Sequence, residues 1–356
     1  WSAELVTPAG NALGFAAVAV PAAGGLVVGL MARVGSQAIR GHGIPEAMEQ
    51  VLRNESRIPF RVMWLKPLSA AIAIGTGGPF GAEGPIIATG GALGSVAGQW
   101  LRMSAVERKI LLAAGAAGGM AATFGTPVAA VLLAVELLLF EFRLRSLVPV
   151  AMASATAAAC RLAWVGAAPF FPLEGLSAPG LAAMAAYTAI GGLVGFAAVA
   201  VTRAVYAVED GFDRLPLHWM WWPALGGLVV GAIGIVAPQT LGVGYENITG
   251  IISGEMALGA VLILSAMKLV SWLVALGSGT SGGTLAPLFT IGGGLGLALG
   301  VAAQALAPGA AIDPRVAAVV GMAGLFAGSS RAFLASALFA FETALEPHLL
   351  LPLLAG

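Results

Sequence analysis

The chain has 356 residues, of which 59% are hydrophobic and only 10% are charged, and its mean hydropathy is +0.94. Soluble domains usually carry about 25% charged residues, so this composition excludes an ordinary soluble protein. The 17 basic and 17 acidic residues balance, which removes the electrostatic case for a nucleic-acid partner, because phosphates call for a clustered basic excess.

Apolar segments long enough to cross a membrane follow one another along the chain. A membrane-spanning helix needs roughly 20 such residues. The segments include residues 12–31, 110–139, 180–201 and 256–276. Short charged stretches at residues 40–61, 102–109, 141–145, 203–214 and 313–315 mark ends that face water. No signal peptide is visible at Trp1. The pattern predicts an all-α, multi-pass integral membrane protein, with residues 1–356 as one transmembrane domain.

The sequence repeats itself. Residues 66–94 align without gaps with residues 268–296, and the identical positions include Lys66 with Lys268 and Pro85 with Pro287. Internal repeats with Gly/Pro-interrupted apolar segments indicate a transporter site at the interface of the two halves. We therefore place a first repeat at about residues 1–175 and a second at about 176–356.

A second repeated block pairs residues 115–136 with residues 321–342. Its last matched position is an acid in both halves, Glu136 and Glu342. Because the two acids are repeated, we interpret them as structural groups that tie helix ends together within each half.

Glycine-proline breaks interrupt the apolar segments at residues 81–85 and 283–287, and residues 40–46 form a third break of this kind. Glycine frees the backbone, and a proline in the first turn suits a helix start, so Pro45, Pro85 and Pro287 are expected to begin helices inside the bundle. A helix N-terminus offers free N–H groups and about half a positive charge, which attract an anion. Three such ends predict a mid-membrane anion site that binds weakly enough to conduct.

Glu83 stands out because its counterpart in the second half is Leu285, although the flanking glycine and proline are kept. An ionisable side chain on an apolar membrane segment is a functional candidate, since its insertion costs about 2.5 to 3.5 kcal/mol. A carboxylate beside an anion site can occupy that site when ionised and leave it when protonated. The alternative is a capped acid with a purely structural role.

These segments resemble a known family. GHGIPE at residues 41–46, GAEGP at 81–85 and GGTLAP at 282–287 are similar, in order and spacing, to the signature segments of the CLC chloride channels and chloride/proton antiporters. The resemblance implies a homodimer with one pore per subunit, inverted repeats and broken helices that point at the anion. It also implies that Glu83 is the gating glutamate. Anion contacts would come from His42, Gly43, Ile44, Ala82, Glu83, Gly84, Thr284, Leu285 and Ala286.

Two positions depart from the family pattern. His42 stands where the family usually has a serine that contacts the anion, and it could either donate to the anion or turn away. Ala82 replaces the usual arginine of the second motif, which removes a positive charge near the outer site.

Leu137 resembles the position where proton-coupled members carry an internal glutamate. Leucine cannot relay a proton, so the sequence favours a chloride channel, with a chloride/proton antiporter as the alternative. The family's pore-lining tyrosine of a last helix has no counterpart, because Tyr187, Tyr206 and Tyr245 occur too early in the chain.

Other functional classes account for fewer of the sequence features. Residues 279–282 fit the GxSG pattern of intramembrane serine proteases, but His42, His218 and His348 fall near segment ends. A fluoride exporter and a sodium-coupled solute transporter are further alternatives. No metal, nucleotide or redox motif is present, so we expect no enzyme activity and no cofactor. Chloride and the lipid bilayer are the expected partners, in a bacterial inner membrane.

Overall fold

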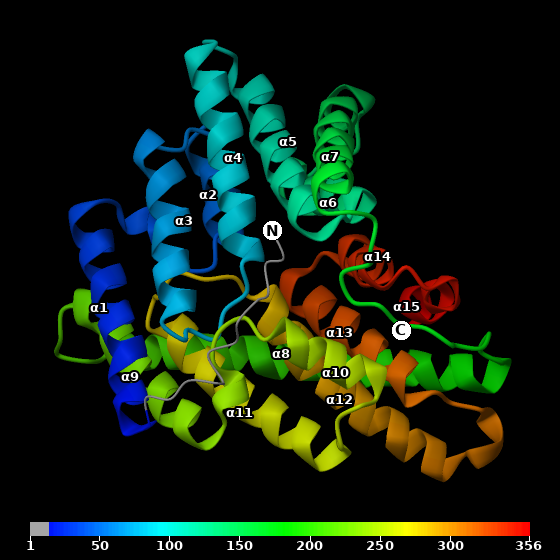
Figure 1. Cartoon of the computed structure of the whole chain (residues 1–356). Coiled ribbons are helices and arrows are strands. Elements are labelled where there is room, and N and C mark those ends of the chain that lie inside the picture. The colour runs from blue at the N-terminus through cyan, green and yellow to red at the C-terminus, as the bar shows by residue number, and fades with distance from the viewer. Residues whose placement is uncertain (1–13) are drawn as a thin grey trace.

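The computed structural model describes residues 14–356 (Figure 1). Within this range the chain is helical, and the only β-type pairings are two isolated bridges. The expectation of no signal peptide at Trp1 and the first residues of the first apolar segment lie outside the described residues. The helices confirm the prediction of an all-α protein.

The described part of the first half, from residue 14 onward, contains seven α-helices and three short helices. These are η2 (Gly14–Val18), α1 (Ala19–Val34), η3 (Gln37–Ile39), α2 (Ile44–Arg53), α3 (Phe60–Gly75), α4 (Glu83–Trp100), α5 (Ala105–Phe124), α6 (Pro127–Ala134), the π-helix η4 (Val135–Leu139) and α7 (Leu144–Trp164).

The second half contains the remaining helices. These are α8 (Leu181–Asp213), η5 (Trp219–Trp221), α9 (Trp222–Val236), η6 (Pro238–Thr240), α10 (Tyr245–Ser253), α11 (Leu258–Gly277), α12 (Leu285–Leu306), η7 (Pro308–Ala310), α13 (Pro314–Ser330), α14 (Phe333–Ala344), η8 (Pro347–Leu349) and α15 (Leu350–Ala355).

Six helical segments of the described chain are long and apolar enough to cross a membrane. They are Gly14–Val34, Leu144–Trp164, Leu181–Asp213, Trp219–Val236, Leu258–Gly277 and Leu285–Leu306. Two expectations were wrong in detail. The apolar run at 110–139 is split into α5, α6 and η4 by Gly125, which ends α5 with a φ of 70°. The charged stretch at 203–214, which we expected to form a short loop at a water-facing end, instead forms the last turns of α8 and its C-cap.

Repeated glycines make the same helix crossing in each half. In the first half, Gly90 of α4 packs against Gly115 of α5, and in the second half Gly292 of α12 packs against Gly321 of α13. A Cβ at any of these positions would collide with the backbone of the facing helix. Close approach through small residues is typical of helix pairs in membranes, where packing replaces the hydrophobic drive.

The two halves meet through reciprocal contacts. Gly25 of α1 packs against the carbonyl of Pro223, and Gly227 of α9, which stands 202 positions after Gly25 as Lys268 does after Lys66, packs against the carbonyl of Pro21. Figure 1 shows α1 and α9 crossing at one side of the molecule. A pair of contacts in which i touches j′ and i′ touches j is the signature of a two-fold axis between matching surfaces. The contacts between α1 and α9 therefore support a two-fold relation between the repeats.

The acids Glu136 and Glu342 make a second reciprocal contact. The carboxylate of Glu136 accepts the N–H groups of Leu334 and Ala335 at the start of α14, at 3.1 and 3.0 Å. The carboxylate of Glu342 accepts those of Val128 and Ala129 at the start of α6, at 3.0 and 2.7 Å. Both acids do cap helix ends, but the prediction that they act within each half was wrong. Each caps a helix of the other half.

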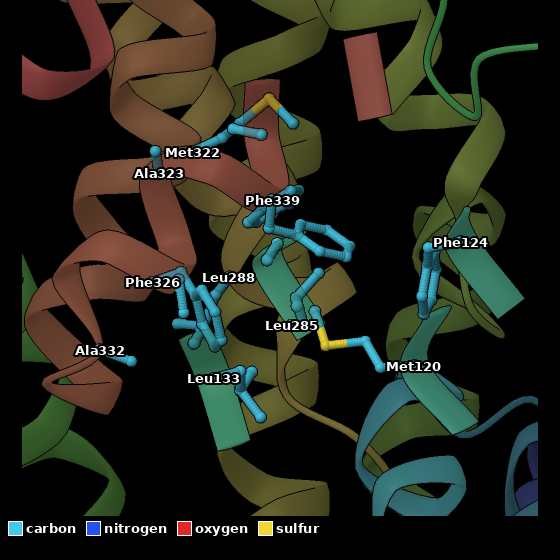
Figure 2. Close-up of a cluster of buried hydrophobic side chains, with 14 of the residues drawn as sticks. Met120, Phe124, Leu133, Leu285, Leu288, Met322, Ala323, Phe326, Ala332 and Phe339 are labelled. Carbon is cyan, nitrogen blue, oxygen red and sulfur yellow. The ribbon is translucent and has the colours of Figure 1, made fainter. Parts of the chain in front are cut away.

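A buried apolar cluster fills the space between the halves (Figure 2). Met120 and Phe124 of α5 face Leu285 of α12 and Phe339 of α14 in this cluster. Leu285 is 2% exposed. The second-half counterpart of Glu83 is therefore a core residue, which explains why a leucine stands there.

Candidate anion site

The three glycine-rich breaks come together at one place. The N–H of Gly81 donates to the carbonyl of Gly283 at 3.0 Å, and the N–H of Gly283 donates to the carbonyl of Gly81 at 2.7 Å. The N–H of Gly282 donates to the carbonyl of Gly41 at 3.3 Å, beside a second bridge between Gly41 and Ser281. Segments that are more than 200 residues apart are thereby joined through their backbones.

Each break leads directly into a helix, as the sequence predicts. Pro45 lies in the first turn of α2, Pro85 in the first turn of α4 and Pro287 in the first turn of α12. The N-cap of α2 is Gly43, with a φ of 97°, and a Cβ there would lie 2.6 Å from the carbonyl oxygen of Gly84. Glycine at position 43 thus lets the starts of α2 and α4 approach each other.

Glu83 is the first residue of α4 and is only 1% exposed. The backbone N–H groups of Glu83 and of Ala286, at the start of α12, lie close enough to stabilise its carboxylate. Its Oε2 atom is packed against Gly81 and Gly283 and has no hydrogen-bond partner among the described residues. The carboxyl group of Glu83 therefore lies where the starts of α4 and α12 converge.

Tyr245 is a site residue that the sequence analysis missed. Its hydroxyl donates to Oε1 of Glu83 at 2.8 Å, so a tyrosine reaches the site from α10, although no counterpart of the family's last-helix tyrosine was predicted. Its ring packs edge-on against Phe170, with a centroid distance of 5.0 Å, and against Phe124 at 6.2 Å.

A repeat signal could have identified Tyr245. Gly242-Val243-Gly244 matches Gly41-His42-Gly43 in pattern, and each precedes a helix, α10 and α2 respectively. The second copy lacks a proline, so a search for glycine-proline breaks passes over it. The described site therefore contains a fourth helix start, that of α10.

Two buried lysines hold the matching glycine segments in place. Nζ of Lys66 donates to the carbonyls of Ile39 and Gly41 at 2.9 and 2.8 Å. Nζ of Lys268 donates to those of Thr240 and Gly242 at 3.0 and 2.7 Å. The repeated lysines thus perform the same task, once before α2 and once before α10.

The residues predicted to contact the anion occupy different positions around this site. His42, Ile44 and Thr284 line a cavity of about 920 Å³, whereas Gly84, Leu285 and Ala286 are buried at the starts of α4 and α12. Ala82 is the N-cap of α4. The N–H of Gly43 donates to Oε2 of Glu46 at 2.6 Å, so in this structure that N–H is engaged by the protein and not directed at an anion.

Leu137 lies in the π-helix η4 and is 3% exposed. Its neighbours Val135, Leu138 and Leu139 are also buried and apolar. The carboxylate of Glu136 is engaged by α14. This part of the site therefore offers no free acid at or beside Leu137.

The serine of the GxSG pattern has a structural contact. Ser281 is fully buried, and its Oγ accepts a hydrogen bond from Oγ of Ser69 at 3.0 Å. Within residues 14–356, no group of His, Cys, Asp and Glu side chains is arranged to hold a metal ion.

Comparison with known proteins supports the family resemblance that the three sequence motifs indicate. The family model "Voltage gated chloride channel" matches residues 24–356. A "Putative chloride channel protein ClcB-like" of Ralstonia nicotianae is 29% identical over 344 residues, covering 96% of this chain and 80% of the relative. An "H(+)/Cl(-) exchange transporter ClcA" of Vibrio campbellii is 31% identical over 323 residues, covering 88% of this chain and 69% of the relative.

Solved structures share the fold. A slow cyanobacterial Cl⁻/H⁺ antiporter superposes with a TM-score of 0.87 at 24% identity, covering 95% of this chain and 80% of that chain. A CLC-type fluoride/proton antiporter superposes with a TM-score of 0.77 at 22% identity, covering 95% and 84%. The bundle predicted from the sequence is thus confirmed as a CLC fold. The chain belongs to the CLC family of anion-transporting, multi-pass membrane proteins and is not an enzyme.

Proposed function

We propose that this protein exchanges chloride for protons across the membrane at a site gated by Glu83. The observation that carries this proposal is the position of the Glu83 carboxylate, which is buried where the starts of α4 and α12 converge. Helix N-termini that attract a carboxylate attract chloride by the same interaction. The two anions therefore compete for one place, and protonation of Glu83 frees that place for chloride.

Backbone N–H groups and cavity-lining residues are the proposed anion ligands. Those at the helix starts are Ala82, Glu83, Gly84, Leu285 and Ala286, and those beside the cavity are His42, Ile44 and Thr284. Gly43 is left out of the resting site because its N–H is engaged by Glu46. Dipolar ligands of this kind bind an anion without burying a fixed cation, which keeps binding weak enough for release.

Exchange is preferred over the channel that the sequence analysis favoured. The named relatives at 30% identity or more are H⁺/Cl⁻ exchange transporters, which supports the antiporter that the sequence analysis gave as the alternative. The channel prediction depended on Leu137 and on the absence of another acid between Leu137 and Glu141. A leucine at one position removes one proton carrier but does not prevent water or another residue from carrying protons to Glu83.

We propose the following domain organisation, assembly and location for the protein. Residues 1–356 form one transmembrane domain of two repeats, and the protein assembles as a homodimer with one pore per subunit in the bacterial cell membrane. Chloride is bound as substrate, and no other cofactor is needed. Small-residue faces on α8, including Gly192 and Gly195, have open space beside them and permit close helix packing.

The proposal is tested with purified protein in liposomes, by recording chloride efflux and proton uptake together for the wild type and for Glu83→Gln. We expect the wild type to take up protons in a fixed ratio to chloride released. The glutamine variant is expected to move chloride without protons, since the amide cannot carry one. Chloride efflux with no proton uptake by the wild type would contradict exchange and support the chloride channel predicted from the sequence.

A further inference from the structure

Exchange requires a path that brings protons to Glu83, whose side chain is 1% exposed. Among the described residues, a cavity of about 920 Å³ reaches the same glycine-rich segments that surround Glu83. Thr284 at the start of α12 and Gly41 beside α2 line this cavity. A polar cavity of this size can hold water, so it offers a route by which a proton can approach these segments from one side.

The π-helix η4 does not supply a carrier for the last step. Leu137 is apolar and buried, and the carboxylate of Glu136 accepts two N–H groups from α14. A proton carrier must therefore come from another element that reaches both the cavity and Glu83.

His42 is the candidate carrier. It lines the cavity, and its Nδ1 atom is buried with no hydrogen-bond partner among the described residues. The His42 carbonyl packs so closely against Gly84 that a Cβ on Gly84 would collide with it. Gly84 directly follows Glu83, so the backbone of the histidine touches the backbone of the gating segment.

The charges around His42 favour the collection of protons in this cavity. Four carboxylates and two guanidinium groups line the cavity. A surplus of negative charge raises the local concentration of cations, protons included. The charged or titratable groups that line the cavity beside His42 are Glu46 and Glu49 of α2, Tyr206, Glu209 and Asp213 of α8, and Arg40 and Arg331 from the adjoining loops, and Lys66 of α3 also acts electrostatically on His42.

We propose that His42 carries protons between the cavity and Glu83, in place of the acid that Leu137 lacks; this inference rests on the proposed exchange. The neutral imidazole accepts a proton from cavity water at one ring nitrogen and becomes imidazolium. The imidazolium then releases the proton of its other nitrogen, through intervening water, to the Glu83 carboxylate. Glu83 becomes a neutral carboxylic acid, the imidazole is neutral again, and chloride can take the freed position.

The test uses the full chain in liposomes, with chloride efflux and proton uptake recorded together for the wild type, His42→Ser and His42→Gln. Serine is the residue that the family usually carries here, and neither substitute carries a proton near neutral pH. Because His42 is also a proposed anion ligand, the readout is the ratio of protons taken up to chloride released, which we expect both variants to lower by about tenfold or more, whatever their chloride rate.

His348→Ser is the matched control, because His348 is exposed in η8 and lies outside the cavity. It should leave the proton-to-chloride ratio unchanged. Retained chloride efflux also shows that the His42 variants are folded. A wild-type ratio in His42→Ser and His42→Gln would overturn the relay, while leaving the exchange proposal intact. A wild type that moves no protons would overturn both.

Discussion

Tyr245 donates its hydroxyl to Oε1 of Glu83 at 2.8 Å, across 162 positions of the chain. The tyrosine begins α10 and the glutamate begins α4, so the contact joins a helix start of the second half to one of the first. A hydrogen bond to a charged group contributes about 1.5 to 3 kcal/mol. Tyr245 therefore stabilises the position in which Glu83 occupies the anion site.

Tyr245→Phe should release Glu83 more readily and raise the rate of chloride efflux, by about tenfold for a loss of about 1.4 kcal/mol. The proton-to-chloride ratio should not change, because Glu83 still carries the proton. Tyr187→Phe is the control. Its hydroxyl accepts the N–H of Asp313 at 2.9 Å, away from the site. Equal efflux rates for the Tyr245→Phe variant and the wild type would contradict a restraining role for this hydroxyl.

The reciprocal caps of Glu136 and Glu342 predict matched losses of stability. Glutamine at either position keeps one carbonyl acceptor but removes the charge that strengthens both hydrogen bonds. Each substitution should lower the free energy of unfolding by about 1 to 3 kcal/mol, and by similar amounts, because the two contacts are related by the repeat. Thermal unfolding in detergent measures the loss of stability. Glu49→Gln is the control, because Glu49 is exposed and accepts one hydrogen bond, from Arg53. A large loss at one position only would argue against the two-fold relation.

Two glycines of α5 allow a direct test of the close helix crossing, because one lies at the crossing and the other does not. A Cβ at Gly115 would collide with the backbone of Gly90, whereas a Cβ at Gly118 would lie 3.7 Å from its nearest neighbour, the carbonyl oxygen of Ala153. Gly115→Ala should therefore destabilise the fold by about 1 to 3 kcal/mol or more. Gly118→Ala should be neutral or slightly stabilising, since alanine is the better helix former. The yield of folded protein and its unfolding temperature distinguish the two. Similar behaviour of both variants would contradict the close crossing of α4 and α5.

The buried lysines predict a parallel effect in the two halves. Methionine at Lys66 or Lys268 would fill the space but leave buried carbonyls without a donor, at about 1 to 3 kcal/mol for each unsatisfied group. We expect both variants to lose stability and chloride transport together, because the glycine segments that they hold shape the site. Lys109→Met provides the control, since Lys109 is partly exposed and makes none of these contacts. Unchanged transport in Lys66→Met and Lys268→Met would show that the segments hold their shape without the ammonium groups.

Much of this architecture could be predicted from local signals. Glycine followed by proline marks the starts of α2, α4 and α12, because the residues themselves determine which backbone conformations are allowed. The absence of an acid in the second half also singled out Glu83. These inferences need no knowledge of how distant segments pack.

The contacts that were missed depend on tertiary structure. Nothing local shows that the α10 start, which lacks a proline, brings Tyr245 to Glu83. The repeat identified Glu136 and Glu342 as a pair, but sequence similarity does not reveal whether a repeated group contacts its own half or the other. The crossing of α1 and α9 through Gly25 and Gly227 is a further contact of this kind. Only the fold shows that these two glycine surfaces face each other.

Proton movement against its own gradient tests the central claim most directly. Liposomes holding the wild-type protein would be prepared with an outward chloride gradient, equal pH on both sides and a membrane potential set near zero. The account predicts that chloride leaving the liposomes drives protons inward, so that the interior acidifies until the two gradients balance, and that Glu83→Gln abolishes this acidification. A wild-type protein that releases chloride while the internal pH stays constant would contradict exchange and identify the protein as a passive chloride conductor.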